Sequence, residues 1–238
     1  MPLSPEQEWT LVACGLMAHA DGVLDVEEWD QVLWMIDERL EGEEVEPWKA
    51  RIADVANLRA YAEGLALPPP LFSQTILEKA WRVALADGYG SPEEASLHDE
   101  LAEQLGIDQE TIGQWRATWT ANARRRSELI AGFAALIARA DDVVTDAERS
   151  RFVELLARLP MTEERRAELR GLVDDPPELM QLVGGFTALA PEERAIAMVG
   201  LAPIVAADDR GTDARSMFIE LAGRVAITRE DAERLLER

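Results

Sequence analysis

Apolar residues recur along the chain at the spacing of one helix face, which predicts helices throughout. Across residues 9–19 and again across 29–36, apolar side chains recur every three or four positions, which is helical spacing. No stretch of useful length alternates residue by residue as a strand does. Pro5, Pro47 and Pro92 lie near the positions where helices are expected to begin. The pattern therefore predicts an all-α fold.

One helical hairpin pattern occurs four times. At residues 18–36, AHADGVLDVEEWDQVLWMI, an apolar run ends at an acid and a glycine, and a second run begins with further acids. Related segments occupy residues 82–107, 135–159 and 203–227. The aspartates that end the first run of each copy are Asp21, Asp87, Asp141 and Asp208.

The spacing of these copies predicts a tandem duplication. The first and third aspartates are 120 residues apart, and the second and fourth are 121 apart. ELAEQLGI at 100–107 likewise matches ELAGRVAI at 220–227. We expect two domains, 1–123 and 124–238, each a bundle of about seven helices built from paired hairpins. At the join, either one helix continues through residues 124–126 or a new helix begins at Ser127 as its N-cap.

Composition narrows the classes of partner. The formal net charge of −22 repels nucleic acid and anionic membranes and attracts cations or basic proteins. The single cysteine excludes a disulfide framework and favours a reducing compartment. The opening residues, MPLSPEQEWT, lack the features of a secretory signal, and no apolar run approaches the roughly 20 residues of a membrane span. We expect a cytoplasmic protein without direct membrane insertion.

The two halves differ in charge and in aromatic content. Residues 1–122 carry a net charge of −17 and residues 123–238 a net charge of −5, and all seven tryptophans lie in the first half. Core positions are expected for Trp9, Trp29 and Trp81. Trp34 and Trp48 flank the acidic stretch 37–46, so we expect them to be partly exposed and to contact a partner.

The acids at the hairpin turns have two interpretations. Ser91 with Glu94, Thr145 with Glu148, and Asp25 with Glu28 have the spacing of capping boxes, which satisfy free N–H groups at a helix start. The four aspartates end helices, where the helix dipole disfavours a carboxylate. They either accept hydrogen bonds from the N–H groups of the following turn or face a bound cation. Carboxylate oxygens are ligands that Ca²⁺ and Mg²⁺ prefer.

The motif ADG-x-x-[DST]-x-E-E, present as HADGVLDVEE and LADGYGSPEE, resembles the tellurite-resistance TerB family, whose domain also occurs in a DnaJ-like co-chaperone. The resemblance implies seven-helix bundles with internal pseudo-twofold symmetry and a divalent-cation site made of acids. It also implies a role in stress response or in membrane-associated assemblies. Matching acids are Asp21, Asp25, Glu28, Asp87 and Glu94 in the first domain, and Asp141 and Glu148 in the second, with Asp208 as a further candidate. Arg215 replaces an acid in the fourth copy.

Signals for catalysis are missing. Cys14 and His19 lie about 140° apart around a helix and do not face one another. His98 follows Glu94 by four residues, so we expect it to form an ion pair or to face water. We predict a non-enzymatic binding module that holds a divalent cation and recruits a protein partner. The alternative is a metal-independent adaptor whose acids cap helices and whose acidic face binds a basic partner.

Overall fold

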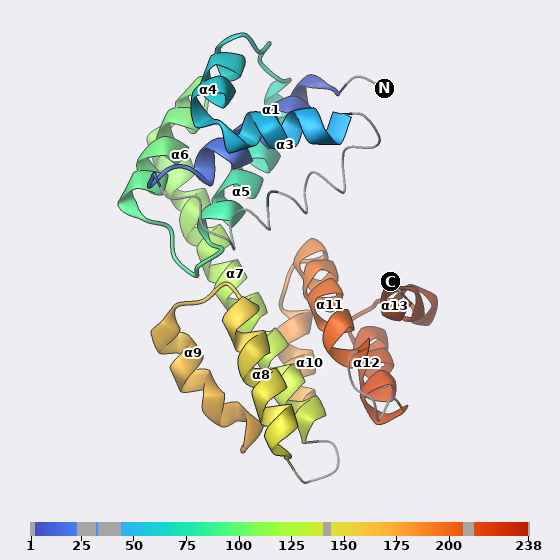
Figure 1. The fold of residues 1–238 in the computed structure, drawn as a ribbon. Coiled ribbons are helices and arrows are strands. Elements are labelled where there is room, and N and C mark those ends of the chain that lie inside the picture. The colour runs from blue at the N-terminus through green and yellow to red at the C-terminus, as the bar shows by residue number, and fades with distance from the viewer. Residues whose placement is uncertain (1–2, 23–31, 33–43, 140–143, 207–211, 238) are drawn as a thin grey trace. The chain divides into compact units, whose positions relative to one another are not determined.

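The computed structural model describes residues 3–22, 32, 44–139, 144–206 and 212–237 (Figure 1). Every regular element in these ranges is an α-helix or a 3₁₀ helix, which confirms the all-α prediction. The chain divides into two compact units, Met1–Ala121 and Asn122–Arg238, close to the boundary expected from the repeat. Among the described helices, none combines the length and apolar character that a membrane crossing requires.

The first unit is organised around its first helix. α1 (Pro5–Met17) packs against α3 (Val45–Ala53), α4 (Val55–Glu63), α5 (Ser73–Ala84) and α6 (Pro92–Gln104). Because neighbours surround it, every side chain from Trp9 to Met17 is buried, as expected of a helix that is apolar on all sides. The 3₁₀ helix η2 (Pro70–Phe72) leads into α5.

The second unit contains α8 (Asp146–Arg158), α9 (Glu163–Leu169), η3 (Arg170–Val173), α10 (Leu179–Thr187), α11 (Pro191–Ala206), α12 (Thr212–Arg224) and α13 (Arg229–Leu236). The last part of α7 (Gln109–Ala138) contributes to its core. Three phenylalanines are fully buried there: Phe133, Phe186 and Phe218.

The join between the sequence halves is helical. α7 runs without interruption from Gln109 to Ala138, so a helix continues through the arginines at 124–126. Ser127 therefore does not cap a new helix. Its hydroxyl group donates to the carbonyl oxygen of Pro160 at 3.3 Å.

Two helices, one in each unit, end with the same backbone geometry. After α6, Gly106 has φ +77° and the N–H of Ile107 donates to the carbonyl oxygen of Ala102 at 2.8 Å. After α12, Ala226 has φ +65° and the N–H of Ile227 donates to the carbonyl oxygen of Ala222 at 2.9 Å. This is a Schellman-type end, at the place where ELAEQLGI and ELAGRVAI align. The duplication itself stays a prediction.

Candidate functional site

The turns after α1 and α5 share one arrangement, an exposed aspartate followed by a glycine with a left-handed backbone. Gly22 has φ +84° after Asp21, and Gly88 has φ +102° after Asp87. Only glycine adopts this region without strain, which explains the Asp-Gly pairs. Oδ1 of Asp87 accepts a hydrogen bond from the backbone N–H of Tyr89 at 3.1 Å. Asp87 thus makes the turn hydrogen bond that was one of its two interpretations.

Glu94 and Glu148 both take part in capping boxes, as their spacing predicted. Oε2 of Glu94 accepts from the N–H of Ser91 at 2.5 Å, and Oγ of Ser91 accepts from the N–H of Glu94 at 3.1 Å. In α8, Oε2 of Glu148 accepts from the N–H of Thr145 at 2.7 Å, and the reciprocal bond measures 3.3 Å. Their geometry is that of helix caps, and a role as metal ligands stays a prediction.

Several predicted site residues lie outside the described residues: Asp25, Glu28, Trp34, Asp141 and Asp208. Within the described ranges, no three side chains of His, Cys, Asp or Glu gather closely enough to hold a metal ion.

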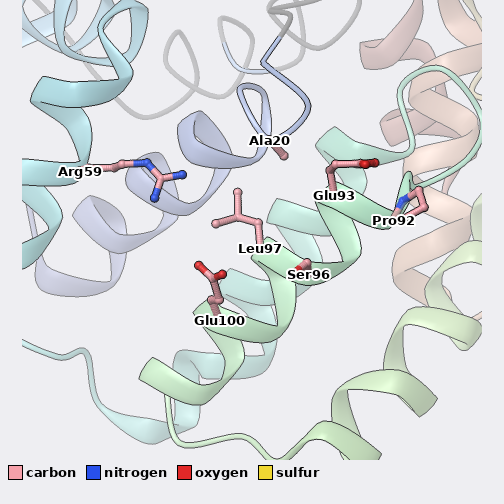
Figure 2. Close-up of a pocket in the computed structure, with 7 residues that line it drawn as sticks. All are labelled: Ala20, Arg59, Pro92, Glu93, Ser96, Leu97 and Glu100. Carbon is pink, nitrogen blue, oxygen red and sulfur yellow. The ribbon is translucent and has the colours of Figure 1, made fainter.

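A pocket of about 460 Å³ lies in the first unit beside these turns (Figure 2). Figure 2 shows Arg59 of α4 facing Leu97 and Glu100 of α6 across the opening. The complete set of described lining residues is Ala20, Arg59, Pro92, Glu93, Ser96, Leu97 and Glu100. Ala20 adjoins Asp21, whereas Pro92 and Glu93 belong to the second hairpin motif, so both motifs contribute to one pocket.

The outer side of α6 forms an acidic stripe, which we call the α6 acidic face: Glu93, Ser96, Glu100 and Glu103. All four side chains are exposed, and their spacing of three or four residues places them on one side of the helix. Within the described part of the chain, none of these three carboxylates joins an ion pair. This face was not predicted from the sequence. The spacing of its acids by three or four residues, along a helix whose other side is apolar, could have revealed it.

Trp48 is buried, so the prediction of its partial exposure is wrong. Only 5% of its surface is accessible, and its ring meets Tyr61 edge-on with centroids 5.4 Å apart. The guanidinium carbon of Arg51 lies 4.7 Å from the Trp48 ring and 4.0 Å from the Tyr61 ring. The Tyr61 hydroxyl group donates to Glu8 at 2.5 Å, and burial with this carboxylate raises the Tyr61 pKa. Arg51 of α3 and Tyr61 of α4 cover Trp48, which removes the basis for a partner contact there.

His98 is also buried, contrary to the expectation of an ion pair or a water-facing position. It lies on the inner side of α6 with no exposed surface, and its ring centroid is 5.2 Å from that of Trp81 and 6.1 Å from that of Trp119. Nε2 lies 2.9 Å from the carbonyl oxygen of Leu77, so Nε2 carries the proton and donates. Burial lowers the pKa of the imidazole to about 4. Trp81 and Trp119 belong to α5 and α7, so the residues next to His98 in the sequence could not predict that it is enclosed by aromatic rings.

Comparison with known proteins locates the first unit within a family. Residues 7–117 match the family model described as tellurite resistance protein TerB, which spans α1 to the first turns of α7. No curated protein and no solved structure shows a significant match to the chain. The match covers the helices, the Asp-Gly turns and the pocket described above, and it identifies residues 7–117 as a TerB-like domain.

Proposed function

We propose that the TerB domain is a non-enzymatic binding module that recruits a basic protein segment through the α6 acidic face. The observation that carries this proposal is the set of exposed carboxylates of Glu93, Glu100 and Glu103, which make no ion pairs within the described residues. The half of the sequence that contains them has a net charge of −17. A field of this sign attracts basic partners and accelerates their association.

The pocket gives this face a shape that suits a lysine or arginine side chain. Leu97 forms an apolar part of its lining, against which the methylene stem of such a side chain packs. Glu93 and Glu100 then receive the charged end. Arg59 on the opposite wall favours a partner segment in which an acid stands near the basic residue. Family resemblance would place such recruitment in a stress-response or membrane-associated assembly.

The experiment is a calorimetric titration of the full chain with a peptide of alternating lysine and alanine residues. Glu93→Gln with Glu100→Gln is compared with Glu63→Gln plus Glu110→Gln, which removes equal charge at exposed positions outside the pocket. Exposed charge pairs contribute about 0.2–1 kcal/mol each, so the first double variant should weaken binding by about 2- to 30-fold. Equal weakening by both variants would leave only a general charge effect and would refute the proposal.

A divalent cation at the Asp-Gly turns is a second proposal. It is supported by the contribution of both hairpin motifs to one pocket, which brings the Asp21 turn toward the start of α6. Thermal unfolding with chelator and then with Ca²⁺ or Mg²⁺ tests it, because a cation at 100 times its dissociation constant adds about 2.7 kcal/mol. Asp21→Asn with Asp87→Asn should abolish that gain. An unmoved midpoint would refute the cation, while peptide binding in chelator would leave the first proposal intact.

We also propose that residues 122–238 are a diverged copy of the TerB domain. One tie recurs in both units: Oγ of Ser73 in α5 donates to the carbonyl oxygen of Leu105 at 3.2 Å, and Nη1 of Arg194 in α11 donates to that of Val225 at 3.0 Å. These donors are 121 residues apart and the acceptors 120 apart, which is the spacing of the predicted repeat. An experimental structure in which α10–α12 fail to superpose on α4–α6 would refute the duplication.

A further inference from the structure

The inner side of α6 holds a polar group that the proposed binding face does not use. His98 has no exposed surface and packs between Trp81 of α5 and Trp119 of α7. Its Nε2 donates to the Leu77 carbonyl oxygen, and its buried Nδ1 has no hydrogen-bond partner. In the neutral ring the only N–H is that of Nε2, which is satisfied by the Leu77 carbonyl oxygen, whereas Nδ1 is an acceptor without a donor. A protonated Nδ1 would be a buried donor without an acceptor.

From this geometry we propose that His98 is an acid-sensing element that releases α6 from α5 and α7 when its imidazole becomes protonated, and so weakens partner binding at the α6 acidic face. The weakening of partner binding rests on the proposed function. The loosening of α6 by acid does not, because it is argued from the packing around the ring.

The two charged side chains that act on the ring have opposite effects on its protonation. Arg116 of α7 bears on the imidazole as a like charge, and Asp99 of α6 acts in the opposite sense. Asp99 is already paired with Arg116, whose guanidinium also lies 5.6 Å from the centre of the Trp81 ring. On the α5 side, the ring meets the Leu77 carbonyl group and the Trp81 ring. Burial is the largest effect and lowers the His98 pKa to about 4.

The sign of the pH effect follows from this lowered pKa. An unfolded histidine titrates near 6.5, so between pH 6.5 and pH 4 the unfolded chain binds a proton that the folded chain refuses. The stability contributed by neutral His98 is complete above pH 6.5 and is lost as the pH falls toward 4. From pH 7 to pH 5 the unfolding equilibrium constant of the first unit should rise about 20-fold through this residue alone.

The second unit supplies a natural comparison for this position. When ELAGRVAI of α12 is aligned with ELAEQLGI of α6, Phe218 takes the place of His98, and Phe218 is fully buried. An apolar aromatic side chain therefore suits a buried position of this kind in the same chain. The imidazole of His98 is not required for packing as such, and its distinguishing property is that it titrates.

The experiment compares full-length wild type with His98→Phe by denaturant unfolding at pH 7 and pH 5. Tryptophan fluorescence reports the first unit selectively, because every tryptophan lies in the first half. Between pH 7 and pH 5, the unfolding equilibrium constant should rise by a factor about 20 times larger in wild type than in His98→Phe. His19→Gln, which changes the chain's other histidine, should retain the wild-type response. Equal pH dependence in wild type and His98→Phe would overturn the proposal.

Two further measurements separate the possible failures. If His98→Phe does not fold, the imidazole resonances of wild type decide: His98 should titrate near 4, and titration of His98 near 6.5 would overturn the proposal. For regulation, affinity for the lysine-alanine peptide should fall more in wild type than in His98→Phe when the pH is lowered from 7 to 4, where the folded His98 becomes protonated. Equal losses would overturn the regulatory half, and absence of peptide binding at pH 7 would overturn the proposed function while leaving acid loosening standing.

Discussion

The carboxylates of the α6 acidic face in the first unit differ from several carboxylates of the second unit that pair with arginine. In the second unit, Glu193 pairs with Arg126 in the interior, and Glu128 pairs with Arg165 at 2.8 Å. In the first unit, the acids of the α6 acidic face make no such pairs within the described residues. The second unit forms a helical core with a net charge of only −5 in its half of the sequence, so a helical core of this kind does not require an acidic excess. The excess in the first unit is therefore the better candidate for function.

The largest expected effect breaks the buried ion pair of the second unit. Arg126→Met removes the guanidinium that pairs with the buried Glu193 carboxylate, and removing one partner of a buried pair costs about 3–5 kcal/mol. Chemical denaturation followed by far-UV circular dichroism measures this loss. Arg126→Met with Glu193→Leu should recover most of it, and a single variant as stable as wild type would show that the pair is not structural.

The next effect tests the packing beside the pocket in the first unit. A Cβ atom at Gly90 would lie only 2.1 Å from the Trp81 ring, so Gly90→Ala forces the ring to move and should cost about 1–3 kcal/mol. Gly113→Ala in α7 is the matched control, since nothing lies within 4 Å of its Cβ position. That control should be neutral or stabilising by up to about 1 kcal/mol. Fluorescence-detected unfolding distinguishes the two variants, and equal stability would contradict the packing described.

Helix caps should have equal importance in the two units. Ser91→Ala and Thr145→Ala each remove a reciprocal capping box and should each cost about 1 kcal/mol of unfolding free energy. Thermal unfolding in chelator measures both losses. If Ser91→Ala proved harmless while Thr145→Ala did not, Glu94 would be serving something other than its helix start.

The smallest effects come from exposed charges. Their removal should lower the stability of the second unit but leave that of the first unit unchanged or slightly raised. Arg165→Gln removes partly exposed pairs with Glu128 and Glu168 and should cost at most about 1 kcal/mol for each pair. Glu100→Gln, by contrast, should leave the stability unchanged or slightly raised, because it relieves repulsion in an acidic domain. A clear loss of stability in Glu100→Gln would show that this carboxylate is structural and would blur the contrast.

Features that depend on neighbouring positions were predictable from the sequence. The capping boxes at Ser91 and Thr145 follow from the reach of a side chain three residues along a helix start. The core positions of Trp9 and Trp81 follow from helical period, and the left-handed glycines at 22 and 88 follow from the Asp-Gly pairs. The TerB match to residues 7–117 likewise agrees with the motif read in HADGVLDVEE and LADGYGSPEE.

Features that depend on distant positions were not predictable. Acidic neighbours in the sequence suggested an exposed Trp48, but Tyr61, a helix away, covers it. The spacing from Glu94 suggested a solvated His98, but Trp119 arrives from α7 and encloses it. Likewise, Arg59 of α4 completes the pocket beside α6 across a separation of more than thirty residues, which no local pattern reveals.

The central claim, that the TerB domain binds a basic segment on the α6 acidic face, is tested most directly by amide chemical-shift mapping. Isotopically labelled full-length protein is titrated with the lysine-alanine peptide in chelator at pH 7. The account predicts that the largest shifts fall on residues 93–103 and near Arg59, and that added salt reverses them. Shifts concentrated in residues 122–238, or spread evenly over all exposed acids, would contradict it.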